Sequence, residues 1–254
     1  MIGVTQARVL RSEWIKLISL RSIALTFAAA FAGMIAFAVL IAWAEVDNWA
    51  TMGAERRAEL TVDEVTLAGR HFAQLAIGVA GVIAISGEYA TGMIRATLAA
   101  VPRRLPVLWA KLAVFAVVTL VLMTLGAFGA FFAGNAILAQ RWDFALSDPG
   151  VLRAVLGTAA GLTAVCLLGT GLGFILRNTA AAISTLFFIL MVLPLVGQFR
   201  PEVAPYLPTN VMSSLATARI DGEMLEPLPA LLVLCGYVVA AIGGAAFTLW
   251  RKDA

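Results

Sequence analysis

The stretch VLRAVLGTAAGLTAVCLLGTGLGFIL (Val151–Leu176) carries one charged side chain, Arg153, close to its start. A helix needs about 20 apolar residues to cross a bilayer core of about 30 Å, so this stretch is long enough. Four glycines follow one another at multiples of four residues: Gly157, Gly161, Gly169 and Gly173. Small residues at this spacing let helix backbones approach closely in membranes. The stretch therefore predicts a transmembrane helix with the four glycines on a helix-packing face.

The whole chain has the composition of an integral membrane protein. Of its 254 residues, 61% are hydrophobic and 13% are charged. A soluble domain carries about 25% charged residues, so this chain has too few to cover a water-facing surface. The formal net charge of +3 comes without a folded basic face, so we expect no nucleic-acid partner.

Five further apolar runs are long enough to span a membrane. With Val151–Leu176 they give an all-α integral membrane protein of six transmembrane helices, in a single transmembrane domain covering residues 1–254. The expected runs are Ser22–Ala44, Leu67–Ser86, Pro106–Leu138, Ala180–Gln198 and Pro227–Trp250. Residues 22–86 thus hold the first two spans and residues 106–250 the last four, with a segment near 199–227 between the fifth and sixth. The third run exceeds the bilayer thickness, so we expect it to tilt or to extend into water at its Pro106 end.

The distribution of Lys and Arg sets the expected orientation, because cytoplasmic segments of membrane proteins are enriched in both. If both termini are cytoplasmic, the inner segments hold most of the basic residues, and their only acids are Glu13, Glu88 and Asp253. The first outer loop collects Glu45, Asp47, Glu55, Glu59, Asp63 and Glu64. We therefore expect a multi-pass protein of a bacterial cytoplasmic membrane, with the tail 251–254 inside.

Residues 1–21 have the pattern of an amphipathic helix. One stripe is apolar and the opposite side is polar: Ala7, Leu10, Trp14, Leu17 and Ile18 against Arg8, Ser12 and Lys16. This pattern predicts a helix lying in the inner interface, with Trp14 at headgroup depth and Lys16 and Arg21 also at the membrane surface. The alternative is a cytosolic extension of the first span.

Several chemistries lack the residues that they need. The chain contains no P-loop motif, no HExxH and no G-x-S-x-G, and His71 is its only histidine. The two cysteines, Cys166 and Cys235, lie inside apolar runs, where we expect small buried hydrophobes. We expect no catalytic, metal-binding or cofactor-binding residue and no enzyme. Acidic residues fall in loops or at span ends, so ion-driven transport lacks obvious machinery, and uphill movement of a solute would need energy from a partner.

The segment GEYATGMIRATLAAVPRRLPVLWAK (Gly87–Lys111) interrupts the apolar runs with charges and prolines. Its pattern predicts a short cytoplasmic helix from Glu88 to Val101, with Gly92 inside it and Pro102 as its stop. In that helix Glu88, Thr91 and Arg95 share one face. The residues alone leave two interpretations: an interfacial loop on anionic headgroups, which we favour for Arg103 and Arg104, or a docking element for a cytosolic partner.

The chain resembles the permease subunits of ABC-2 type transporters, especially the small six-span exporter subunits of high-GC Gram-positive bacteria. Three stretches carry the resemblance: Ser12–Leu17 with Leu20–Ser22, Gly87–Arg95 with Pro102–Arg104 and Lys111, and Tyr206–Asn210. The resemblance implies that residues 1–21 are an elbow helix and that residues 87–105 hold a coupling helix. It also implies that five residues contact an ATPase subunit: Glu88, Tyr89, Thr91, Gly92 and Arg95.

The resemblance further implies the assembly and the activity. Two ATP-binding subunits, which hold ATP and Mg, would join two permease copies, and we expect the permease to form a homodimer in membrane lipid. The activity would be export of a hydrophobic or amphiphilic substrate such as a drug, a peptide antibiotic or a lipid. No substrate-contacting residue is assigned. The alternative is a membrane anchor or regulatory protein that recruits a cytosolic partner without transport, and an intramembrane enzyme is the least favoured class.

Overall fold

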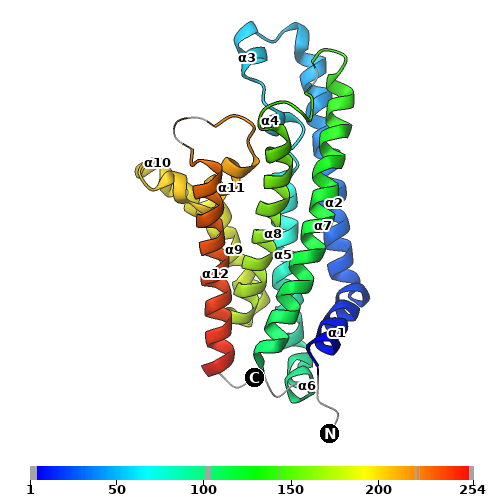
Figure 1. Cartoon of the computed structure of the whole chain (residues 1–254), viewed down its shortest axis with the longest axis vertical. Coiled ribbons are helices and arrows are strands. Elements are labelled where there is room, and N and C mark those ends of the chain that lie inside the picture. Colours follow the sequence, from blue (N-terminus) through cyan, green and yellow to red (C-terminus); the bar gives the residue numbers. More distant parts are fainter. Residues whose placement is uncertain (1–4, 101–103, 143, 221, 223, 252–254) are drawn as a thin grey trace.

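The chain folds as a bundle of helices (Figure 1). The computed structural model describes residues 5–100, 104–142, 144–220, 222 and 224–251. Within these ranges every regular element is a helix, and six helices are long and apolar enough to cross a membrane. The expected all-α fold with six helices able to span a membrane is therefore confirmed for the described residues.

The six candidate spans agree with the six expected runs, with shifts at their ends. The second span differs most, because it begins at Arg70 and continues to Ala90 instead of covering Leu67–Ser86. The spans are α2 (Arg21–Asp47), α5 (Arg70–Ala90), α7 (Arg104–Leu138), α8 (Val151–Leu176), α9 (Thr179–Phe187) with its continuation to Phe199, and α12 (Pro227–Arg251).

The fifth span is not one regular helix. After α9 the chain forms a wide π-turn at η2 (Phe188–Val192), a 3-10 turn at η3 (Leu193–Leu195) and the short α10 (Val196–Phe199). Pro194 has no backbone N–H to donate, so the regular hydrogen-bond ladder cannot continue through this position. The irregular backbone thus follows from the sequence Leu193-Pro194-Leu195.

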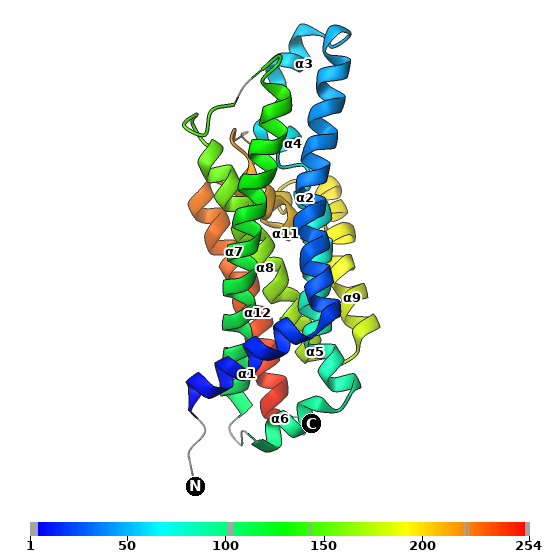
Figure 2. The ribbon, with the colours of Figure 1, turned by 90° about the vertical axis from the view of Figure 1, so that its right-hand side faces the viewer.

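Shorter helices lie at the two ends of the bundle (Figures 1 and 2). The end that holds α1 (Gln6–Ser19), α6 (Met93–Ala100) and the last turn of α12 is called the α6 end below. The opposite end holds α3 (Ala54–Glu59) and α4 (Val62–Val65) and is called the α3 end. The remaining short elements are η1 (Asn48–Ala50), η4 (Ala204–Tyr206) and α11 (Pro208–Ala216).

The helix α8 is the centre of the bundle. In its most apolar window 72% of the residues are buried, against 17% in the fifth span (Thr179–Phe199) and in α12. Its glycines lie where neighbouring helices come closest. A Cβ on Gly169 would meet the carbonyl oxygen of Gly78 in α5, and a Cβ on Gly157 would meet that of Leu215 in α11. Gly173 likewise faces α5 and Gly161 faces Met212 of α11, so the expected packing face serves two different neighbours.

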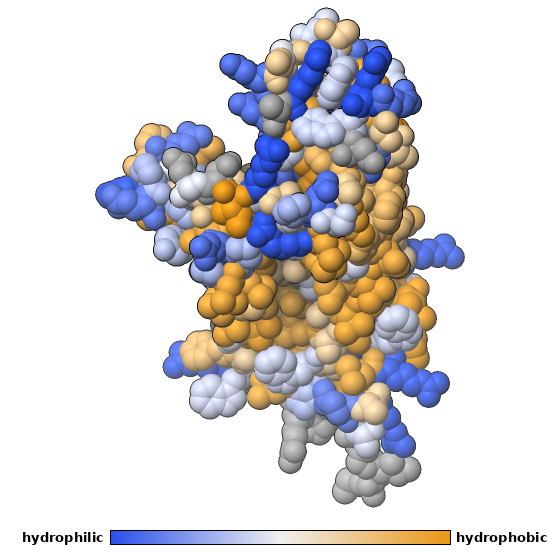
Figure 3. All heavy atoms as spheres, turned by 45° about the horizontal axis from the view of Figure 1, so that its top comes forward, coloured by the Kyte–Doolittle hydropathy of each residue, from blue (hydrophilic) through white to orange (hydrophobic). Residues whose placement is uncertain are grey.

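The outer surface suits a bilayer. Figure 3 shows an apolar belt between two ends that carry hydrophilic side chains. Large exposed apolar residues supply this belt from several spans, among them Leu40, Val121, Leu125, Leu232 and Val239. In water such a continuous surface would drive aggregation, whereas lipid chains solvate it.

We predict that Gly169→Ala lowers the stability of the bundle by about 1–3 kcal/mol, because the added methyl overlaps the backbone of α5. Thermal unfolding in detergent measures the loss. Gly236→Ala in α12 is the matched control, since nothing lies within 4 Å of the added Cβ there, and it should be neutral or slightly stabilising. Equal melting temperatures for the two variants would contradict the close α5–α8 contact.

Candidate functional site at the α6 end

The backbone of the segment between the second and third spans differs from the expected single helix. α5 continues to Ala90, Gly92 takes a left-handed conformation with φ of 71°, and α6 begins at Met93. The prediction of one helix through Gly92 is therefore wrong, because a left-handed residue ends a right-handed helix. Glu88 and Tyr89 belong to the last turn of α5, so Glu88 does not share a helix face with Thr91 and Arg95. Val101, Pro102 and Arg103 lie outside the described residues.

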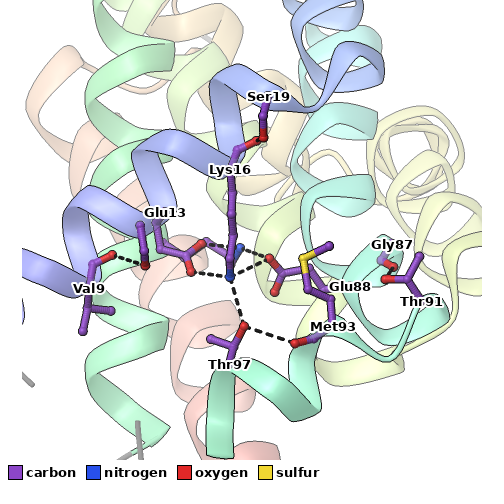
Figure 4. A network of polar contacts seen from close by, with 11 residues as sticks. Val9, Glu13, Lys16, Ser19, Gly87, Glu88, Thr91, Met93 and Thr97 are labelled. Atoms are coloured by element: carbon purple, nitrogen blue, oxygen red, sulfur yellow. Dashed lines mark hydrogen bonds and ion pairs between the residues drawn. The ribbon is translucent and has the colours of Figure 1, made fainter. Parts of the chain in front are cut away.

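Two carboxylates and two ammonium groups meet inside the protein at this end (Figure 4). They are Glu13 and Lys16 of α1, Glu88 of α5 and Lys111 of α7, which we call the charged cluster. Glu13, Glu88 and Lys111 are only 2–3% exposed. Their burial shows that Glu88 points into the bundle and is not available on the surface.

Lys111 is the central cation of the charged cluster. Its Nζ lies 2.9 Å from Oε1 of Glu88 and 2.5 Å from Oε2 of Glu13. Lys16 approaches the same two carboxylates from α1, with its Nζ 2.7 Å from Oε1 of Glu13 and 3.1 Å from Oε1 of Glu88. The four groups have no net charge when all are ionised, and this balance offsets part of the desolvation of each one.

The charged cluster also reaches α6. The ammonium group of Lys16 donates a hydrogen bond of 3.1 Å to the hydroxyl of Thr97, which itself donates to the carbonyl oxygen of Met93 (Figure 4). Four helices therefore meet at one set of polar contacts: α1, α5, α6 and α7.

The face of α1 that packs on the bundle differs from the expected stripe. Val9, Glu13 and Leu17 are its buried residues, whereas Trp14 is 47% exposed and Ile18 is also exposed. The expected polar face is wrong for Lys16, whose ammonium group turns toward the carboxylates of the cluster instead of lying at a free surface. The ion pair between Lys16 of α1 and Glu88 of α5, rather than the apolar pattern of α1, explains which way Lys16 points.

The remaining expected site residues are spread around this end. The guanidinium carbon of Arg177 lies over the ring of Tyr89, 5.0 Å from the centroid of that ring. Thr91 and Gly92 are exposed in the turn before α6, and Arg21 is exposed at the start of α2. Arg95 lies in α6 and Arg104 begins α7, but the side chains of both are outside the described part of the chain.

The sequence interpretation did not single out Glu13 or Lys111 as site residues. Lys111 had a usable signal, because it stands inside a long apolar helix where an unpaired ammonium group is costly. Glu88 and Glu13 are acids that the sequence places at the same side of the membrane as Lys111. Lys111 pairs with both of them.

Comparison with protein-family models and with curated proteins finds no match to this chain. The resemblance to ABC-2 permeases therefore rests on the quoted residues alone.

We predict that Lys111→Met lowers the stability of the protein by about 3–5 kcal/mol, because among the described side chains it leaves two buried carboxylates with Lys16 as their only cation. Thermal unfolding in detergent measures the effect, with Arg8→Met on the exposed side of α1 as the control. The exchange Glu88→Lys with Lys111→Glu should recover part of the loss. A Lys111→Met variant as stable as the control would refute the pairing.

The charged cluster also predicts a loss of stability at alkaline pH. Burial lowers the pKa of Lys16, but its hydrogen bonds with Glu13 and Glu88 and their charges raise it by more, so that the pKa stands above its ordinary value of 10.5. A raised pKa in the folded protein means that the stabilisation is complete below 10.5 and is lost as the pH rises through the folded value.

The melting temperature difference between the native chain and Lys16→Met should therefore stay constant from neutral pH to about 10 and shrink above 10.5. Lys16→Arg keeps its charge over this range, so the difference in melting temperature between Lys16→Arg and Lys16→Met should stay the same as at neutral pH. A constant Lys16→Met difference up to pH 12 would count against the pairing of Lys16.

Proposed function

We propose that the chain is the membrane-spanning permease subunit of an ATP-driven exporter of the ABC-2 type. The observation that carries this proposal is the link between α6 and three other helices through the charged cluster. A short helix at one end of a six-span bundle, joined to buried groups of α1, α5 and α7, has the construction that a force-transmitting element requires.

The transmission would run through short connections. α6 follows α5 after only Thr91 and Gly92, and Lys16 holds Thr97 of α6 against Glu13 and Glu88. A displacement of α6 by a partner would thus move the ends of α5 and α1 with it, and Lys111 would carry the displacement into α7. Two ATPase subunits, holding ATP and Mg, would supply that displacement to two permease copies.

The partner would bind the exposed side of α6. Met93 is 40% exposed, and Ala96 and Ala99 are exposed on the same short helix. Together with Thr91 and Gly92, these residues form an uncharged surface within the described part of this segment, and such a surface suits a groove in another protein. This assignment replaces Glu88 as a direct contact, because a carboxylate that is 3% exposed acts on the partner only through the position of α6.

The orientation and the substrate class complete the proposal. The Lys and Arg bias supports a cytoplasmic α6 end, where an ATPase of a bacterial cell would have access to it, with α1 along the inner lipid surface. The apolar character of the spans suits a hydrophobic or amphiphilic cargo that leaves the cytoplasm.

We predict that Met93→Glu weakens the recovery of an ATP-binding subunit with the tagged native chain about tenfold, because the added carboxylate faces the partner groove. The measurement is a mild-detergent pull-down followed by mass spectrometry. Met224→Glu is the matched control, since it places the same change on an exposed methionine in the segment before α12, which precedes that helix at the end away from α6.

Recovery of a stoichiometric ATPase that Met93→Glu reduces and Met224→Glu does not would support the transporter. Recovery of a non-ATPase partner through the same helix would overturn it in favour of a membrane anchor. Equal recovery of the ATPase with both variants would remove α6 as the docking element.

A further inference from the structure

A small cavity lies where α5, α8 and α11 meet, on the side of the bundle near Arg70. Its volume is about 10 Å³. The lining comes from all three helices: Arg70, His71 and Gln74; Gly157, Thr158, Gly161 and Leu162; Thr209, Met212, Ser213 and Ala216.

Gln74 is a buried polar residue in the lining of the cavity. Its side chain is buried, with 3% exposed, yet its amide makes no hydrogen bond to any described residue. A buried amide without a partner costs about 1–3 kcal/mol, and native proteins rarely leave one unsatisfied. The amide atoms of Gln74 are not fully enclosed by protein atoms, and Gln74 lines the cavity, so a small ligand held there could complete their hydrogen bonds.

Two threonine hydroxyl groups belong to residues that line the same cavity as Gln74. Thr158 donates to the carbonyl oxygen of Ala154 at 2.8 Å, and Thr209 donates to that of Leu190 at 2.9 Å. Each hydroxyl thus donates its proton to the backbone, and its oxygen can still accept a hydrogen bond. Gln74 adds both a donor and an acceptor, so the site presents a complementary set of groups to a molecule that donates and accepts.

The size and the charge of the cavity select the ligand. A volume of about 10 Å³ is about that of one water probe, the least that an ordered water needs. Among the described residues, the lining contains one cationic side chain, Arg70, and no carboxylate, which disfavours a metal ion. We propose that Gln74, Thr158 and Thr209 form a binding site for a single water molecule, which joins α11 to α5 and α8 inside the membrane-spanning bundle.

This site is independent of the ATPase proposal, because it concerns only how α11 is held. The experiment is a density map of the purified full-length chain at a resolution that shows ordered water, combined with thermal unfolding of two variants. Gln74→Met keeps the length of the side chain and removes the amide. Gln140→Met makes the same change at an exposed position and is the control.

A bound water predicts a density peak within hydrogen-bond distance of Gln74 and a melting temperature of Gln74→Met lower by about 3–8 °C than that of the control. An empty cavity in a map that shows other ordered waters would overturn the proposal. So would a Gln74→Met variant as stable as the control or more stable, because removing an unsatisfied amide is favourable. A peak at metal–oxygen distances of about 2.0–2.6 Å would identify a cation instead.

Discussion

The position of Lys111 is the constraint on which the α6 end depends. An ammonium group this deep in an apolar helix is acceptable only beside carboxylates, and it has two, Glu88 and Glu13. To satisfy it, α5 must continue past the expected end of its span and α1 must turn Glu13 inward. The course of α1 across the bundle and the position of the turn before α6 both follow from this requirement.

The contact between α5 and α8 rests on a different force. Lipid chains are as apolar as the helices, so helix association in a membrane depends on close packing. Gly169 of α8 meets the backbone of α5 at Gly78, and Gly81 of α5 meets the backbone of α8 at Cys166, so a side chain on either glycine would force the helices apart. α5 is therefore fixed along its length by packing and at its α6 end by charge.

The sequence was sufficient for the features that depend on local composition. The six spans follow from apolar length, and the glycines of α8 lie at helix contacts because their spacing is itself the packing surface. The charged cluster was not predictable in this way, because it joins residues almost 100 positions apart from three helices. Gly92 illustrates the same limit: helical periodicity continued through it, and only the backbone conformation shows that it separates Glu88 from α6.

Charged groups hold α5 at its other end as well. Arg70 lies 3.4 Å from Asp63 of α4, whose carboxylate accepts a hydrogen bond of 3.2 Å from Thr217 after α11. With Glu88 at one end and Arg70 at the other, α5 is tied to elements on both sides of the span. In the proposed transporter, movement of α6 would therefore shift α5 and α8 as one body, and the lightly buried α9 and α12 would be the spans that change their position against it.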